Sequence, residues 1–115
     1  MSLDVTLYLD IDTGGKEKRM FELYDANITH NLNTMAIEAK IYDVVWRPDE
    51  NGIETAGEII KPLKKGIAAM KKNPDKFIKL NPSNGWGSYI DFIPWLEKYL
   101  TACIENPKAK ILVSR

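Results

Sequence analysis

The chain has 115 residues, 44% of them hydrophobic and 28% charged, a balance typical of one globular domain spanning residues 1–115. Its single cysteine, Cys103, excludes an internal disulfide and a cysteine-based zinc site, and no apolar stretch reaches the ~18 residues of a membrane span. The net charge is zero, yet residues 1–60 carry 12 acids and 5 bases whereas residues 61–79 carry 7 bases and 1 acid. We therefore expect surfaces of opposite charge.

The first 24 residues predict a β-hairpin. Apolar and polar residues alternate from Leu3 to Ile11, which is the period of a half-buried strand. The turn sequence DTGGK follows, and its paired glycines accept positive φ. Residues 19–24 then read as the returning strand. Because a strand at this position is not a signal peptide, we expect a cytoplasmic protein without a membrane span.

Helical periodicity dominates the middle of the chain. Asn27 is a candidate N-cap, and apolar residues recur at helical spacing after it, so we predict a helix over residues 28–40. The apolar segment IYDVVWRPDENG then ends in a loop and a turn. A longer helix is predicted over residues 55–72, bent or interrupted near Pro62, with lysines on its outer side.

The last third of the chain completes the fold class. A short helical turn is expected at Phe77, and the glycine-rich loop NPSNGWGS follows it. Residues 89–103 show the strongest helical stripe, with Pro94 in the first turns. Cys103 lies on the apolar face of this stripe, so we expect a buried thiol. Residues 109–114 predict a closing strand. The order β-β-α-α-α-β predicts an α+β fold, in which the N-terminal hairpin and the C-terminal strand form a three-stranded antiparallel sheet with about three helices on one face. Either hairpin strand could pair with the C-terminal strand.

Neutral polar residues form a stripe on the first predicted helix. Asn27, His30, Asn31 and Thr34 follow the i, i+3, i+4, i+7 spacing of one helix face. Such groups offer donors and acceptors at a small desolvation cost, which suits a neutral or nucleobase-like ligand. The structural alternative is that Asn27 caps the helix, His30 bonds a nearby carbonyl and the others face water. A catalytic role for His30 lacks support, since no nucleophile or paired carboxylate accompanies it.

Two aromatic motifs add candidate ligand contacts. Trp46 and Arg47 are adjacent, and an indole with a guanidinium can stack on a base and hold a phosphate. Asn84 precedes Trp86, which lies between two glycines that allow the backbone to approach a ligand closely. The alternatives are that Trp46 closes the core edge, that Arg47 pairs with a nearby acid, and that a buried Trp86 pins its loop. The predicted ligand-binding residues are Asn27, His30, Asn31, Trp46, Arg47, Asn84 and Trp86.

Metal and nucleic-acid sites have weaker signals. Asp10 and Asp12 share a strand face before the glycine turn, where two carboxylates could hold magnesium. A further alternative is therefore a metal-assisted hydrolase that uses Asp10, Asp12 and His30. The lysines of residues 61–79 lack the interleaved arginines and aromatic residues of a nucleic-acid surface. We therefore expect no cofactor, no metal site and no nucleic-acid partner.

Three motifs carry a family resemblance. NITHNLNTMA, IYDVVWRPDENG and NPSNGWGSY together resemble a family of small, uncharacterised proteins encoded by tailed bacteriophages and prophages, over nearly the whole chain. The chain departs from that family's pattern at Lys40, where the family has a glycine before IY. The resemblance implies a phage accessory protein, without enzymatic activity, in the bacterial host cytoplasm.

The motifs and the resemblance together lead us to expect a binding module that sequesters a small nucleotide-like ligand and counters host defence. Asn27, His30 and Asn31 would hydrogen-bond the ligand, the tryptophan of either aromatic motif would stack on it, and Arg47 would neutralise phosphate. The alternative is a protein–protein inhibitor or a structural accessory protein that contacts a host or virion protein. A ligand binder of this size is expected to be a homo-oligomer, because one small domain encloses a ligand poorly.

Overall fold

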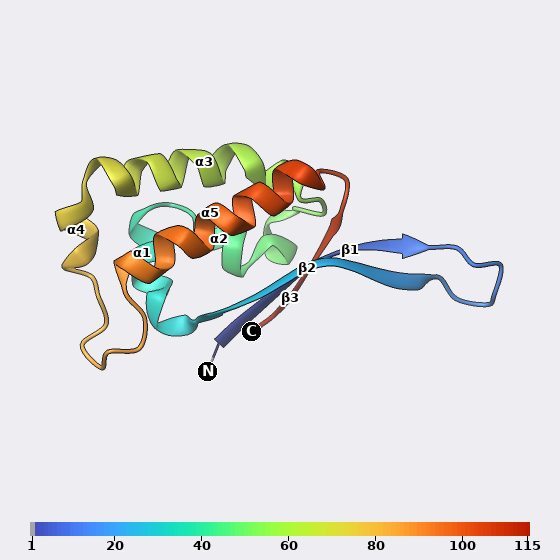
Figure 1. Ribbon diagram of the computed structural model, residues 1–115, viewed down its shortest axis with the longest axis horizontal. Helices are drawn as coiled ribbons and strands as arrows, with labels where there is room; N and C mark the ends of the chain where they lie inside the picture. Colours follow the sequence, from blue (N-terminus) through green and yellow to red (C-terminus); the bar gives the residue numbers. More distant parts are fainter. Residues whose placement is uncertain (1) are drawn as a thin grey trace.

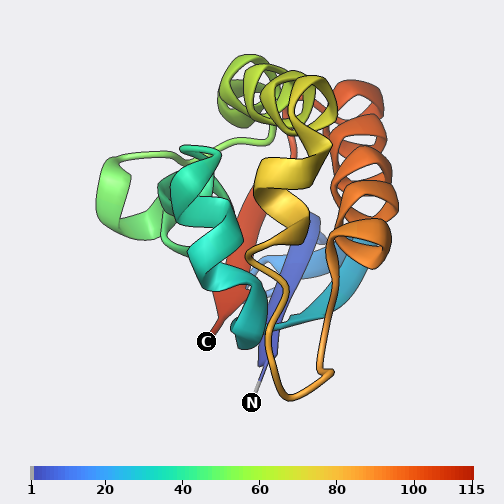
Figure 2. The same cartoon turned by 90° about the vertical axis from the view of Figure 1, so that its left-hand side faces the viewer.

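The computed structural model describes residues 2–115 and contains a three-stranded antiparallel sheet with helices packed on one face (Figure 1, Figure 2). Strand β1 (Ser2–Ile11) lies between β2 (Arg19–Thr29) and β3 (Lys110–Ser114). The predicted α+β fold, with an N-terminal hairpin and a C-terminal strand, is confirmed. The structure also decides the strand order: β3 pairs with β1, over five residue pairs.

Five α-helices and two 3₁₀ helices join the hairpin to the last strand within residues 2–115. In chain order they are η1 (His30–Leu32), α1 (Asn33–Glu38), α2 (Tyr42–Trp46), η2 (Pro48–Asn51), α3 (Gly57–Lys72), α4 (Pro74–Ile78) and α5 (Tyr89–Glu105). The two long helices, α3 and α5, contain Pro62 and Pro94 as the sequence predicted. No helix in this part of the chain is long and apolar enough to cross a membrane.

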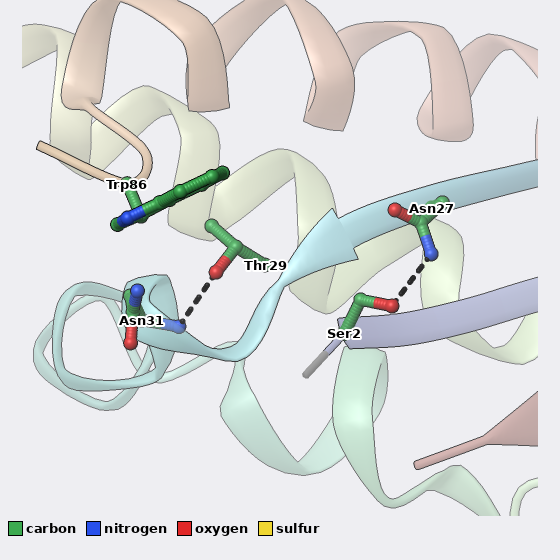
Figure 3. A pocket seen from close by; sticks show the side chains of 5 residues that line it. All are labelled: Ser2, Asn27, Thr29, Asn31 and Trp86. Atoms are coloured by element: carbon green, nitrogen blue, oxygen red, sulfur yellow. Dashed lines mark hydrogen bonds between the residues drawn. The ribbon is translucent and has the colours of Figure 1, made fainter.

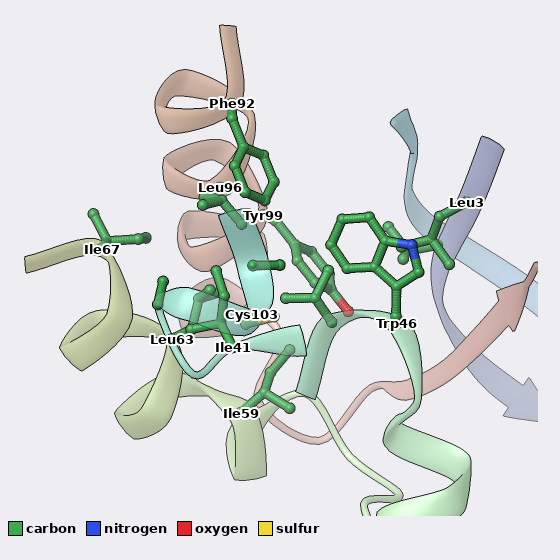
Figure 4. Packing of buried hydrophobic residues seen from close by; sticks show 14 of the residues in the cluster. Leu3, Ile41, Trp46, Ile59, Leu63, Ile67, Phe92, Leu96, Tyr99 and Cys103 are labelled. Atoms are coloured by element: carbon green, nitrogen blue, oxygen red, sulfur yellow. The ribbon is translucent and has the colours of Figure 1, made fainter. Parts of the chain in front are cut away.

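The hydrophobic core lies between the sheet and the helices. On β1, Leu3, Val5 and Leu7 are fully buried, while the residues between them are half-buried or exposed. This period of two places one face of the strand in the core and leaves the other open. Trp46 and Tyr99 are among the largest buried side chains of this core, to which Leu3 also belongs (Figure 4).

Cys103 is a buried thiol of this core, as predicted from its place on the apolar stripe of the last helix. Burial raises the pKa of its thiol to about 12. Burial also raises the pKa of Tyr99, whose hydroxyl has no hydrogen-bond partner within residues 2–115. Both groups stay neutral at ordinary pH, which is the form that an apolar interior favours.

The first helix begins later than predicted. Strand β2 continues to Thr29, and helical structure starts only at His30. Thr29, and not Asn27, is the N-cap, since its hydroxyl accepts a hydrogen bond from the Asn31 N–H at 3.3 Å. The prediction of a helix from residue 28 was wrong because the β-branched residues Ile28 and Thr29 favour extended backbone when a partner strand lies alongside. Asn27 therefore lies on a strand, and the four polar residues do not form one helix face.

The outer part of the hairpin extends beyond the helices (Figure 1). The pairing of β1 with β3 ends at Tyr8, and a β-bulge interrupts the β1–β2 register between Leu7 and Tyr8. Past the bulge, Leu9 and Phe21 face each other across the ladder and are 39% and 54% exposed. We call residues 9–21 the hairpin arm. It carries apolar side chains that the helices do not cover.

Candidate ligand-binding site

A pocket of about 420 Å³ opens at the end of the hairpin opposite the arm, where β1 begins and β2 ends (Figure 3). We call it the Trp86 pocket, and its lining residues are Ser2, Asn27, Thr29, Asn31 and Trp86. This volume falls in the range of roughly 300–1,000 Å³ typical of small-molecule sites. The strand ends and η1 supply hydroxyl and amide groups, while the loop between α4 and α5 supplies an indole.

The strand side of the pocket is held by hydrogen bonds around Asn27. Its side-chain NH₂ group donates to Ser2 Oγ at 2.8 Å and to Asp4 Oδ1 at 2.7 Å. Its backbone carbonyl accepts a hydrogen bond from the Trp95 indole N–H at 2.9 Å, which ties β2 to α5. Because both side-chain hydrogens are engaged, Asn27 can meet a ligand through its Oδ1 acceptor.

Trp86 is held in an exposed position by the backbone of its loop. Gly85 and Gly87 have φ angles of +78° and +96°, in the left-handed region that favours glycine. Asn84 Oδ1 accepts a hydrogen bond from the Trp86 backbone N–H at 3.0 Å and closes the turn. The Trp86 side chain is 70% exposed, so it is not a buried anchor of its loop. Both flanking glycines are needed for this conformation.

The loop is seated closely on η1. A Cβ atom at Gly87 would lie 2.8 Å from Thr29 Cγ2 and 3.0 Å from Leu32 Cγ, so only a glycine allows this approach. One residue later, Ser88 begins α5 as its N-cap, with its Oγ accepting a hydrogen bond from the Asp91 N–H at 3.2 Å. The indole is thus carried by a short segment between two fixed points, η1 and the start of α5.

His30 and Trp46 bond to each other and do not line the pocket. The Trp46 indole N–H donates to His30 Nδ1 at 3.0 Å, so the neutral imidazole carries its proton on Nε2. Trp46 is 1% exposed, stacks on Tyr42 at 5.7 Å between ring centroids and meets Phe92 edge-on at 6.1 Å. Trp46 thus belongs to the core, in agreement with the alternative that it closes the core edge. A ligand can reach the indole of Trp86, whereas the core encloses that of Trp46.

Arg47 lies outside the pocket, between α2 and η2. Its Nε–H donates to the Tyr42 hydroxyl at 3.0 Å, and Nη1 donates to Glu50 Oε2 at 2.8 Å. These hydrogen bonds, that with Glu50 first, raise the pKa of the Arg47 guanidinium above its ordinary value. The geometry therefore does not combine this guanidinium with the exposed indole in one site.

Among residues 2–115, no cationic side chain lines the Trp86 pocket. Its five side chains are hydroxyl, amide and indole groups. Within residues 2–115, the ionisable side chain bonded to them is Asp4, through Asn27. A carboxylate at this place repels an anion and favours a neutral or cationic group. The pocket is therefore suited to a planar neutral ring and poorly suited to phosphate.

The pocket brings together some of the predicted ligand-binding residues and not others. Those that line it are Asn27, Asn31 and Trp86. Those that lie elsewhere are His30, Trp46, Arg47 and Asn84. Sequence reasoning missed Ser2 and Thr29, which pair with each other at the end of the β1–β2 ladder. Their hydroxyls could have been placed only by extending the hairpin to this pair, which the predicted helix from residue 28 prevented.

The carboxylates considered as metal ligands lie far along the hairpin from His30. Asp10 Oδ2 accepts a hydrogen bond from Lys110 Nζ at 2.7 Å, and Asp12 Oδ1 accepts one from the Gly14 N–H at 2.9 Å. In residues 2–115 no three His, Cys, Asp or Glu side chains gather closely enough to hold a metal ion. Most of the length of β1 separates Asp10 from the His30 end of the hairpin.

Comparison of the chain with protein-family models, with curated proteins and with solved structures found no match. Its function is therefore inferred from the chemistry of the pocket and of the exposed surfaces.

Proposed function

We propose that this protein is a non-enzymatic binding module that sequesters a small nucleotide-like ligand in the Trp86 pocket. The observation that carries the proposal is the position of Trp86. Its indole is 70% exposed, and its loop places it beside hydrogen-bonding groups of the pocket. An exposed aromatic ring offers its face to a flat ligand, and stacking of one base on such a ring contributes about 1–3 kcal/mol.

The ligand's base stacks on the indole, and its polar edge meets the neutral groups of the pocket. Asn31 offers an amide donor and acceptor, Thr29 a hydroxyl, and Asn27 its Oδ1 atom. Phosphate groups of the ligand project into solvent, because the lining described within residues 2–115 holds no cation. A nucleoside and its nucleotide should therefore bind with similar affinity.

The lining also supports a binding role over a catalytic one. Its serine, threonine, asparagines and tryptophan include no general base, and the Asp4 carboxylate near Ser2 accepts a hydrogen bond from the Asn27 amide. Removal of a signal nucleotide by a phage accessory protein, in the host cytoplasm and against host defence, is the role that fits both this chemistry and the family resemblance of the motifs.

The test is isothermal titration calorimetry with a panel of nucleosides, nucleoside monophosphates, and cyclic mono- and oligonucleotides. We expect one class to bind, and Trp86→Ala to weaken that binding by roughly fivefold or more, since stacking of one base on an aromatic side chain contributes about 1–3 kcal/mol. Asn31→Ala should weaken it as well. Because both side chains are exposed, neither variant should change the melting temperature appreciably.

Ile90→Ala is the matched control. Ile90 is an exposed apolar residue close in sequence to Trp86, but it does not line the pocket, so its replacement should leave the affinity unchanged. The proposal fails if the folded wild-type protein binds no member of the panel, or if Trp86→Ala binds as tightly as the wild type.

A second candidate function is protein–protein binding through the hairpin arm. Large apolar side chains remain exposed there, namely Leu9, Ile11, Met20 and Phe21. Strand β2 is also an edge of the sheet, so a row of its backbone groups has no strand partner within residues 2–115. A second copy of the chain would cover both features, because two edge strands related by a twofold axis can pair. The expected homo-oligomer is proposed to form in this way.

Sedimentation equilibrium tests this second candidate. The wild-type protein should form a dimer that Phe21→Asp weakens, whereas Ile90→Asp, at an exposed apolar position away from the arm, should not. A wild-type protein that stays monomeric at high micromolar concentration would refute the dimer. If such a monomer retained a host protein in a pull-down through Phe21, the inhibitor alternative would take its place.

A further inference from the structure

A second hollow, of about 460 Å³, lies between the end of α1, the middle of α3 and α4, at the end of the molecule that Figure 2 faces. It shares no lining residue with the Trp86 pocket. The polar residues that line it are Glu38, Lys40, Lys65, Asn73 and Lys76. Three lysines against one glutamate give these residues a net charge of +2, which attracts anions. We call it the lysine hollow.

Part of the wall of the lysine hollow is apolar. Ala39, Pro62, Ala69 and Phe77 contribute to it. Phe77 is 2% exposed, so it is part of the packed core and not a mobile cover. Gly66 lets α3 approach the turn after α1, since a Cβ atom there would lie 3.3 Å from the Ala39 carbonyl oxygen. An apolar wall beside cationic groups matches an anion with an apolar body better than a bare inorganic ion.

The lysines of the hollow differ in how they are engaged. Lys76 Nζ lies 2.8 Å from Glu38 Oε1, and this hydrogen bond is the main cause that lowers the pKa of the Glu38 carboxyl below its ordinary value. The charge of Lys40 lowers the same pKa, so Lys40 is close to this pair. Within residues 2–115, Lys40 and Lys65 form no ion pair. Their ammonium groups are therefore available to a ligand.

Lys40 occupies a backbone position that favours glycine. Its φ is +62°, and it is the one non-glycine residue with a positive φ in the described chain. It ends α1 in a Schellman turn, in which the Lys40 N–H donates to the Ile37 carbonyl at 3.0 Å and the Ile41 N–H donates to the Ala36 carbonyl at 3.0 Å. A Cβ atom is strained at this position. Strained backbone of this kind clusters at active sites and ligand-binding sites.

We propose that the lysine hollow binds a small aryl phosphate. The phosphate meets the ammonium groups of Lys40 and Lys65, and the ring lies against the apolar wall that includes Ala69 and Phe77. Glu38 competes with the ligand for Lys76, so this third lysine contributes when the carboxylate is displaced. In this proposal the strained backbone at Lys40 has a role, since it places an ammonium group at the site.

The test is titration of the full chain with phenyl phosphate, followed by calorimetry and by ¹H–¹⁵N NMR, with inorganic phosphate for comparison. Phenyl phosphate should bind more tightly than inorganic phosphate and should shift the amide signals of Gly66 and Ala69. Lys65→Ala should weaken the binding roughly threefold to fivefold, the effect of one partly solvated charge. Glu38→Gln should strengthen it, because it releases Lys76.

Lys40→Gly is the most informative variant, because stability and binding should move in opposite directions. The melting temperature should rise as the strain is relieved, while phenyl phosphate should bind roughly threefold to fivefold more weakly. A loss of affinity in a more stable protein cannot come from unfolding.

Lys64→Ala is the matched control, on the same helix but outside the lysine hollow, and it should leave the affinity unchanged. Three results would each overturn the proposal. They are no binding of phenyl phosphate at millimolar concentration, an equal loss of affinity in Lys64→Ala, and a Lys40→Gly variant that binds as tightly as the wild type.

Discussion

In the substitution Gly66→Ala, helix propensity and core packing have opposite effects on the stability of the protein. Gly66 is buried in the middle of α3, where propensity alone would make alanine about 1 kcal/mol more stable than glycine. An alanine Cβ would, however, overlap the Cγ2 methyl of Ile41 and lie 3.3 Å from the Ala39 carbonyl oxygen. Ile41 is fully buried, so it cannot move aside without displacing its neighbours.

We expect packing to outweigh propensity in Gly66→Ala. Overpacking of a core costs typically about 1–3 kcal/mol, and the overlap with a fully buried methyl group places this substitution near 3. Subtracting the gain of about 1 kcal/mol leaves a net destabilisation of about 2 kcal/mol. For 115 residues the entropy of unfolding is about 0.24 kcal/mol/K, so the melting temperature should fall by about 8 °C. Differential scanning calorimetry measures this change, and urea denaturation with an unchanged m-value checks it.

Ala68→Gly is the control for propensity, because Ala68 is an exposed residue of the same helix. It should cost about 1 kcal/mol, or about 4 °C, without any change in packing. In an Ile41→Ala background the overlapping methyl is gone, so Gly66→Ala should become stabilising. The reasoning is refuted if Gly66→Ala melts at or above the wild-type temperature, or if it destabilises the Ile41→Ala protein equally.

Three other outcomes follow from contacts elsewhere in the molecule. Cys103 should not react with Ellman's reagent at pH 8 in the folded protein, because burial raises its pKa to about 12, and it should react fully in guanidinium chloride; rapid labelling of the folded protein would contradict its burial. Gly87→Ala should destabilise by about 1–3 kcal/mol in urea denaturation, since its Cβ would lie 2.8 Å from Thr29 Cγ2; an unchanged midpoint would show that the loop is not seated there. His30→Ala should cost about 1–3 kcal/mol, because the buried N–H of Trp46 loses its acceptor; wild-type stability would count against that bond.

The sequence by itself determined the elements that bury one face. Alternate residues of β1 and the helical stripe of α5 could be recognised because each apolar face repeats with the period of its own backbone. The thiol of Cys103 was placed in the core for the same reason. The conformation of Thr29 depends on its pairing with Ser2 in the neighbouring strand, which periodicity does not show. The predicted helix therefore began too early.

The candidate site was decided by tertiary structure. In sequence, Trp46 and Trp86 were equal candidates for stacking on a ligand, but the first is 1% exposed and the second 70%. The difference arises from distant contacts: Phe92 packs on Trp46, while the loop of Trp86 rests on η1 through Gly87. Periodicity is a local property of the chain and can be read from it. Which polar side chains meet in a pocket depends on contacts between residues far apart in sequence, and these exist only in the folded protein.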